Sequence, residues 1–105
     1  MAFTNDIVQT VWDKGRAMPD WDSTRWRKDR CGAWMRREQY GMESTEFAWK
    51  IENISPGGAD EVENLQPFHR ANTFNRNTGK ATCHVTADRQ GLRPTEQIDN
   101  PSNKF

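Results

Sequence analysis

The chain has 105 residues, a length that fits one small domain and leaves no room for a second. Only 33% of the residues are apolar, and 15 Lys and Arg residues balance 15 Asp and Glu residues. Because the charges balance, nucleic-acid binding cannot be inferred simply from a basic net charge. No apolar run approaches the roughly 20 residues of a membrane span. Because the N-terminal residues lack the basic-then-apolar pattern of a signal peptide, we expect a cytoplasmic protein.

The zero net charge hides an uneven distribution along the chain. Residues 14–37 carry eight basic and three acidic residues, whereas residues 38–63 carry one basic and seven acidic residues. The charges either form a phosphate-binding surface around a cation site or pair with one another on a solvated surface. The basic residues that could grip phosphates are Arg25, Arg27, Lys28, Arg30, Arg36 and Arg37.

In the first half of the chain, residues 4–14 have the spacing of a helix, with Thr4 or Asn5 as its N-cap and Gly15 at its end. A loop follows over residues 16–24, and residues 30–35 are consistent with a strand or one arm of a hairpin. The sequence expectation for the larger aromatic residues is a place in the core, because few other apolar residues exist to form one. These residues are Trp12, Trp34, Phe47, Trp49 and Phe68, whereas Trp21 and Trp26 are predicted to be more exposed.

In the second half, Phe47, Trp49 and Ile51 alternate with the smaller or charged residues Ala48, Lys50 and Glu52, which is the pattern of a strand. Pro67 suits the first turn of a helix over residues 68–75, and Thr78-Gly79 predicts a turn before a short strand over residues 81–86. Residues 90–105 are polar with two prolines, so we expect a flexible tail after a single domain over residues 1–89.

The two cysteines, Cys31 and Cys83, lie far apart and form no C-x-x-C pair, so zinc held by cysteines is not expected. A disulfide between them would require an oxidising compartment outside the cytosol, so we expect both to be reduced, partly buried thiols.

A set of spaced residues in the middle of the chain carries a resemblance to a known family. The predicted strand ends in Glu52-Asn53, a loop with Gly57-Gly58 follows, then Asn64-Leu65, and then His69 and Asn72 on the predicted helix. This order resembles the core of the HNH endonucleases, which have a ββα-metal fold. Upstream pieces also resemble the approach segment of one small HNH subfamily, so that the resemblance covers residues 11–75. These pieces are Val11–Gly15, Arg27–Asp29, Cys31–Trp34 and Tyr40-Gly41.

The resemblance implies an α+β domain of the ββα-metal type with an additional N-terminal helix. It implies one divalent metal, Mg²⁺ or Zn²⁺, held by Glu52, His69 and Asn72, while Asn64 fixes the loop by hydrogen bonds. The chain departs from the family where the chemistry needs a general base, because Asn53 stands in place of the strand His. A carboxamide does not titrate near neutral pH, and Glu52 is one methylene longer than the usual Asp. Whether the site still holds a metal is therefore left open.

These observations lead to two hypotheses about function. In the first, the chain is a catalytically impaired HNH-like domain that binds nucleic acid or a nucleic-acid-processing protein complex, as an inhibitor from a phage or mobile element would. The alternative is an active metal-dependent HNH endonuclease that cleaves DNA phosphodiester bonds. A third interpretation, a structural protein without a nucleic-acid role, would leave the basic residues as surface charges.

Overall fold

The computed structural model describes residues 3–42, 44–87 and 98–99. The single α-helix of this described part is α1 (Asn5–Trp12), whose N-cap Thr4 accepts a hydrogen bond from the Ile7 N–H at 3.3 Å. Its buried residues, Val8, Val11 and Trp12, recur at helical spacing, which confirms the predicted helix. None of the helices in this part of the chain has the length and apolar character needed to cross a membrane.

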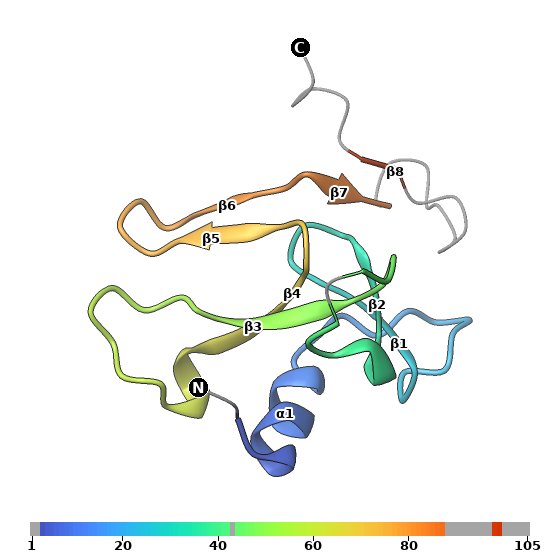
Figure 1. The fold of residues 1–105 in the computed structure, drawn as a ribbon, viewed down its shortest axis with the longest axis horizontal. Helices are drawn as coiled ribbons and strands as arrows, with labels where there is room; N and C mark the ends of the chain where they lie inside the picture. The colour runs from blue at the N-terminus through green and yellow to red at the C-terminus, as the bar shows by residue number, and fades with distance from the viewer. Residues whose placement is uncertain (1–2, 43, 88–97, 100–105) are drawn as a thin grey trace.

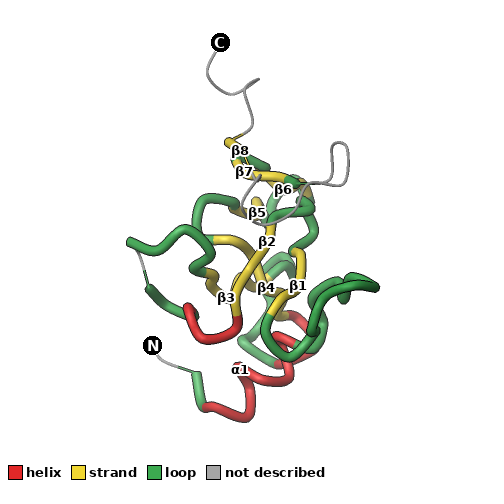
Figure 2. The backbone as a smooth tube through the Cα atoms, turned by 90° about the vertical axis from the view of Figure 1, so that its right-hand side faces the viewer, coloured by secondary structure: helices red, strands yellow, loops and turns green. Residues whose placement is uncertain are grey.

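The strands pair two by two into four small antiparallel sheets. They are β1 (Trp26–Lys28) with β2 (Trp34–Arg36), β3 (Trp49–Asn53) with β4 (Leu65–His69), β5 (Thr73–Asn75) with β6 (Lys80–Thr82), and β7 (Val85–Thr86) with β8 (Ile98–Asp99). Two short 3-10 helices, η1 (Arg37–Gln39) and η2 (Val62–Asn64), connect them. The β3–β4 sheet lies in the middle, with α1 below it and the β5–β6 hairpin above it (Figures 1 and 2).

The prediction of a helix over residues 68–75 is wrong. The chain continues as strand β4 through His69, turns, and returns as β5. Pro67 lies within β4 opposite Ile51, and β4 pairs with β3 along its whole length from Trp49↔His69 to Asn53↔Leu65. A proline signal for a helix start is local, whereas this pairing with β3 depends on residues 12 to 20 positions away, and the non-local contact decides the structure. The domain is therefore α+β, and the helix that a ββα-metal arrangement requires at this point is a pair of strands instead.

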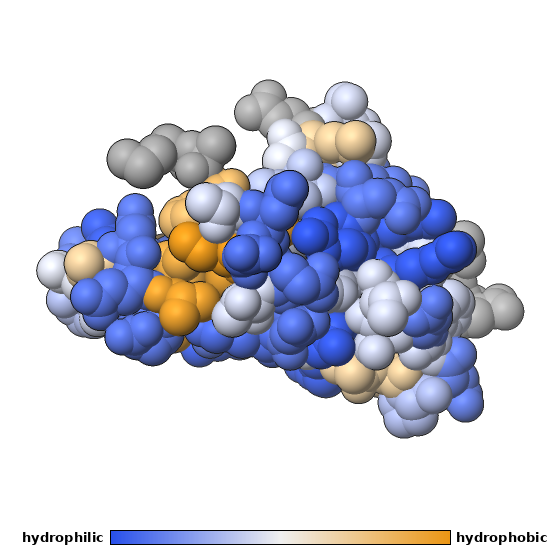
Figure 3. Space-filling view, turned by 90° about the horizontal axis from the view of Figure 1, so that it is seen from below, coloured by the Kyte–Doolittle hydropathy of each residue, from blue (hydrophilic) through white to orange (hydrophobic). Residues whose placement is uncertain are grey.

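The main hydrophobic core lies between α1 and the β3–β4 sheet. It consists of Val8, Val11, Trp12, Met35, Trp49 and Leu65. The Trp12 and Trp49 ring centroids are 5.1 Å apart, and aromatic pairs at such distances add to the burial of their surface. Seen from the α1 side, the molecule is mostly hydrophilic, and its most strongly hydrophobic residues gather in one patch (Figure 3).

A second group of aromatic rings forms around Trp34. Trp34 is buried, and the half-buried Trp21 and Trp26 lie with ring centroids 5.1 and 6.1 Å from it. Phe47 packs edge-on against Trp26 at 5.0 Å and is itself only half-buried. Trp21 and Trp26 are more exposed than Trp34, as expected, but their rings pack with it in one aromatic cluster.

The expectation of two reduced cysteines is also wrong. Cys31 and Cys83 form a disulfide that joins positions 52 residues apart, with a Cα–Cα distance of 5.5 Å. The bond brings the end of β6 to the turn before β2, where the Thr86 hydroxyl donates to the Cys31 carbonyl and the Ala87 N–H to that of Gly32. Disulfides persist in oxidising compartments, so this bond weighs against the cytoplasmic location, which stays a prediction.

The predicted flexible tail lies almost entirely outside the described residues. Its described part, Ile98–Asp99, is strand β8, which pairs with β7.

Candidate functional site

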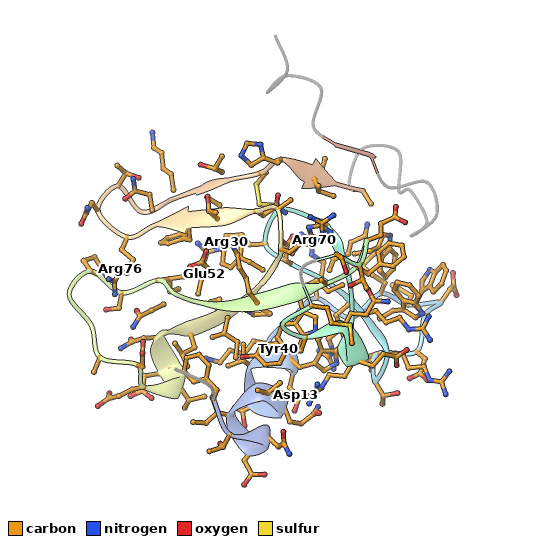
Figure 4. The ribbon with its side chains drawn as sticks, in the orientation of Figure 1. Asp13, Arg30, Tyr40, Glu52, Arg70 and Arg76 are labelled. Carbon is orange, nitrogen blue, oxygen red and sulfur yellow. A yellow bond between two sulfur atoms is a disulfide. The ribbon has the colours of Figure 1, made fainter. Side chains whose placement is uncertain are left out.

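An open groove of about 620 Å³ lies between the end of β3, the loop that follows it, and the β5–β6 hairpin. Its lining is mostly polar and comprises Glu52, Asn53, Asp60, Thr73, Phe74, Asn75, Arg76, Asn77 and Thr82. Figure 4 shows Glu52, Arg30 and Arg76 in the space between β3 and β5. The groove therefore contains both residues at which the chain departs from the HNH pattern, Glu52 and Asn53.

Asn53, at the position where the HNH resemblance would place a general base, holds the loop by hydrogen bonds. Its Nδ2 donates to the carbonyls of Gly58 and Ala59 at 3.2 and 3.0 Å and to Oδ1 of Asp60 at 3.0 Å. Its Oδ1 accepts from the Ser55 N–H at 2.9 Å. Both polar ends of this side chain are thus engaged within residues 53–60, and its carboxamide has no proton to exchange near neutral pH.

Asn64, predicted to fix the loop, reaches the same segment from the other side. Its Nδ2 donates to the Ala59 carbonyl at 3.1 Å. The close packing also explains Gly58, because a Cβ there would lie 2.7 Å from the Ser55 side chain and 3.0 Å from Asn64 Nδ2. Asn53 and Asn64 together define the shape of the loop that forms one wall of the groove.

Glu52 and His69 lie on opposite faces of the β3–β4 sheet. In the register, Glu52 pairs with Gln66 and Trp49 with His69, so three residues separate the two positions along the strand. Three residues span about 10 Å, and an odd separation places side chains on opposite faces of a sheet. The face of Trp49 and His69 turns toward the core, while that of Glu52 turns toward β5–β6, where the rings of Phe68 and Phe74 meet at 6.1 Å. The structure does not bring Glu52 and His69 together.

His69 and Asn72 instead join Asp29 in a buried polar cluster, each of the three residues being at most 2% exposed. One oxygen of Asp29, Oδ2, accepts from the His69 N–H at 2.9 Å and from Asn72 Nδ2 at 3.0 Å, while Oδ1 accepts from the Ala33 N–H at 2.9 Å. Burial raises the pKa of Asp29, and these hydrogen bonds act in the opposite direction without cancelling that shift. The cluster links the β1–β2 turn to the end of β4.

The remaining polar atoms of His69 and Asn72 are also engaged. His69 Nδ1 accepts from the Ala71 N–H at 3.1 Å, so Nε2 carries the proton and donates to the Glu46 carbonyl at 2.6 Å. Asn72 Nδ2 donates to the Val85 carbonyl at 3.0 Å, and Oδ1 accepts from the N–H groups of His84 and Val85 at 2.8 and 2.9 Å. These contacts give both residues a structural role.

The expected metal ligands therefore do not fit one shared ion. Glu52 forms an ion pair with Lys50 at 3.3 Å, whereas the His69 side chain lies on the opposite face of the sheet. Asn72 is fully buried, and its side chain is bound to Asp29 and residues 84–85. Ligand bonds to Mg²⁺ or Zn²⁺ are about 2.0–2.2 Å long, far too short to bridge this separation. No group of three His, Cys, Asp or Glu side chains suited to a metal ion occurs among the described residues.

Two of the six predicted phosphate-binding residues serve the fold. Lys28 is 2% exposed, its ammonium donates to the Ala87 carbonyl at 3.3 Å, and it lies 5.1 Å from the Trp34 ring centroid. The Arg27 guanidinium donates to three carbonyls, those of Ser23, Asp13 and Gly15, at 2.8–3.0 Å. These two side chains are committed to holding loops together.

The other four predicted residues lie nearer the surface but at different places. Arg36 and Arg37 lie over the rings of Trp26 and Trp49 at 5.3 and 5.9 Å, and Arg25 is exposed 4.0 Å from Asp22. Arg30 is exposed over the Phe74 ring at 5.0 Å, beside the groove. It also lines a second hollow of about 280 Å³ together with Lys14, Arg16 and Lys28. Among the six, Arg30 is the one that contacts a residue of the groove lining, Phe74.

The sequence-based search missed the basic residues of the β5–β6 hairpin. Arg76 lines the groove, and Lys80 is exposed on β6. The available signal was the absence of any Asp or Glu from residue 65 to residue 87, a stretch that contains Arg70, Arg76 and Lys80. This signal was not used because the HNH-like motif ends at residue 72, just before the hairpin begins.

No protein-family model matches the chain, and no curated protein or solved structure matches it either.

Proposed function

We propose that this chain is a catalytically impaired HNH-like domain, in which strands replace the helix of the ββα-metal fold, and that it binds nucleic acid without hydrolysing it. The observation that carries the proposal is the state of Asn53, which faces the groove where the family has its general base. Its amide is fully used by residues 55–60. Because Asn53 cannot accept a proton, the rate of hydrolysis loses the contribution of a general base, about 10²–10⁴-fold. The walls of the groove that would hold a polynucleotide remain.

The position of His69 supports the same conclusion. A histidine that activates water or holds a catalytic metal must reach the substrate, but His69 is 1% exposed and its ring nitrogens bind backbone groups of Glu46 and Ala71. The geometry therefore does not favour the alternative, an active metal-dependent endonuclease, in which Glu52 and His69 would share an ion.

The lining of the groove suits binding to a polar polymer. Amide and hydroxyl groups from Asn75, Asn77, Thr73 and Thr82 supply donors and acceptors, and Arg76 supplies a positive charge on the hairpin wall. Arg and Lys bind phosphate oxygens, while Asn and Thr side chains contact both backbone and base edges. The proposed ligand is thus nucleic acid held mainly by the hairpin side of the groove.

One observation favours a second candidate partner, a basic protein surface. Residues 51–69 contain four acidic and no basic residues besides His69, and Asp60, Glu61 and Glu63 are exposed in the loop wall. Such a surface could occupy a cationic DNA channel of a nucleic-acid-processing complex and so inhibit it. This partner would contact the loop wall, whereas nucleic acid would contact the hairpin wall.

The test combines a binding and a cleavage measurement on the whole chain. We expect fluorescence anisotropy at about 50 mM salt to show binding to a labelled duplex that weakens as salt rises. In parallel, supercoiled plasmid with Mg²⁺, Mn²⁺ or Zn²⁺ should stay intact. Nicking that disappears in Glu52→Gln, with unchanged thermal melting, would replace the proposal by the active endonuclease. Absence of any duplex binding at low salt would remove the nucleic-acid proposal.

A further inference from the structure

The two faces of the β5–β6 hairpin differ in chemistry. On the inner face Phe74 pairs with Ala81, and the Phe74 ring packs 6.1 Å from buried Phe68. On the opposite face the pairs are Thr73↔Thr82 and Asn75↔Lys80. All four of these residues are exposed, and Thr73, Asn75 and Thr82 also line the groove. This face therefore presents hydroxyl, amide and ammonium groups, with neither an apolar nor an acidic side chain.

Two buried or covalent contacts fix the base of the hairpin, although most of the hairpin itself is exposed. Asn72, just before β5, is fully buried and binds Asp29 and residues 84–85. Cys83, just after β6, is held by the disulfide to Cys31. A segment with almost all its residues exposed gains little stability from packing, so its order comes from these two anchors.

The tip of the hairpin is also ordered. Asn75 Oδ1 accepts from the N–H groups of Asn77 and Thr78 at 2.9 and 3.3 Å, and the Gly79 N–H donates to the Asn75 carbonyl at 2.9 Å. Gly79 has φ of 71°, a conformation that glycine adopts without steric cost. Arg76 and Asn77 are thus presented at an exposed tip whose backbone is already arranged.

From these features we infer that the β5–β6 hairpin enters the major groove of duplex DNA, with Arg76 and Lys80 contacting phosphates or guanine edges. This inference rests on the proposed function and names its partner and its contact surface. A two-stranded ribbon fits the major groove of B-DNA, which is about 12 Å wide, whereas the deep and narrow major groove of A-form RNA does not admit one. Charge complementarity supports the choice, because residues 65–87 contain no acidic side chain to repel phosphate.

The inference places the contact away from the basic segment that the sequence first suggested. In that segment Lys28 is buried and Arg27 is bound to three carbonyls, so neither is presented to a ligand as Arg76 and Lys80 are. The two surfaces can be compared directly by removing two positive charges from each.

The experiment measures duplex DNA affinity as a function of salt for the double variant Arg76→Ala/Lys80→Ala. The matched control is Arg25→Ala/Arg36→Ala, which removes the same charge from the basic segment. We expect the hairpin variant to bind about tenfold more weakly and to lose about 1.8 from the slope of log affinity against log salt, near 0.9 for each phosphate contact. The control should stay within about threefold of the unmodified chain. Thermal melting of both variants confirms that they are folded.

Three outcomes separate the inference from the proposed function. A larger loss in the control variant than in the hairpin variant would overturn the hairpin as the contact surface while leaving the proposed function intact. Equal affinity for duplex RNA and duplex DNA would overturn insertion into the major groove. No binding by the unmodified chain would overturn the proposed function itself.

Discussion

The buried polar cluster of Asp29, His69 and Asn72 and the open groove at the end of β3 use the same kinds of side chain for different purposes. In the cluster, the Asp29 carboxylate binds the Asn72 amide and the His69 N–H, the His69 ring binds backbone groups, and solvent is excluded. In the groove, Glu52, Asp60 and Arg76 line a space open to a ligand. The comparison teaches that residues of one sequence motif can take different roles. Those on one face of the sheet stabilise the fold, while those on the other face line a space for a ligand.

The largest effect should come from the centre of the cluster. Asn72→Ala removes four hydrogen bonds: Asp29 Oδ2 loses one of its two donors, and the N–H groups of His84 and Val85 and the Val85 carbonyl lose their Asn72 partner. We expect the free energy of unfolding to fall by about 3–5 kcal/mol, since each stranded buried group costs about 1–3 kcal/mol. Urea denaturation measures this loss. The exposed Asn77→Ala should change stability by less than about 0.5 kcal/mol, and similar losses in both variants would contradict the structural role of Asn72.

Loss of the disulfide should have the next largest effect on stability. Replacing Cys31 and Cys83 together by Ser, or reducing the unmodified chain, should lower the free energy of unfolding by about 2–4 kcal/mol because a long loop is released. Intact-mass measurement without reductant should give a mass lower by two hydrogen atoms than the reduced chain. A melting temperature that does not respond to reductant would show that the bond is absent or contributes nothing.

Asp29 tests the cluster through pH. Asp29→Asn turns an acceptor of three N–H groups into a side chain that carries donors, and we expect a loss of about 1–3 kcal/mol. Burial raises the pKa of Asp29 above the value of 3.8 of a free side chain, so the folded state binds its proton more tightly than the unfolded state does.

The sign of the pH dependence follows from that shift. The stability that Asp29 contributes is fully present below pH 3.8 and falls as pH rises through the raised pKa. The stability difference between the unmodified chain and Asp29→Asn should therefore be larger at about pH 3.5 than at about pH 7. Comparing the two chains by urea denaturation cancels the titration of the other carboxylates. A difference that grows with pH would show that hydrogen bonds outweigh burial at Asp29.

The sequence predicted correctly those secondary-structure elements that depend mainly on neighbouring residues. The helix α1 followed from its cap and the spacing of Val8, Val11 and Trp12, and strand β3 from the alternation around Trp49. The segment after Pro67 could not be predicted this way, because its structure comes from pairing with β3 and from the contacts of Asn72 with residues 84–85. The Cys31–Cys83 bond is likewise a contact between distant positions without a spacing signal.

The candidate site divides along the same line. The motif placed Glu52 and Asn53 side by side at the end of a strand, and both line the groove. It grouped His69 with them only through a helix that the structure does not form, and the change from helix to strand moves His69 to the other face. The hairpin wall with Arg76 lies beyond the motif, so its part in the groove depended on the fold.

The smallest effect concerns restoring the missing base. Asn53→His supplies a titratable group at the position where the HNH resemblance would place a general base. It also removes the amide that holds residues 55–60. We expect the free energy of unfolding to fall by only about 1 kcal/mol, which is typical of partly exposed hydrogen bonds. We expect no plasmid nicking with Mg²⁺, Mn²⁺ or Zn²⁺, because a base without a complete set of metal ligands does not complete the site, and Glu52 and His69 lie on opposite faces of the β3–β4 sheet. Asn53→Gln serves as the control for disturbance of the loop. Nicking by Asn53→His, and not by Asn53→Gln, would show that Glu52 and His69 come together in solution and that the division between cluster and groove is incomplete.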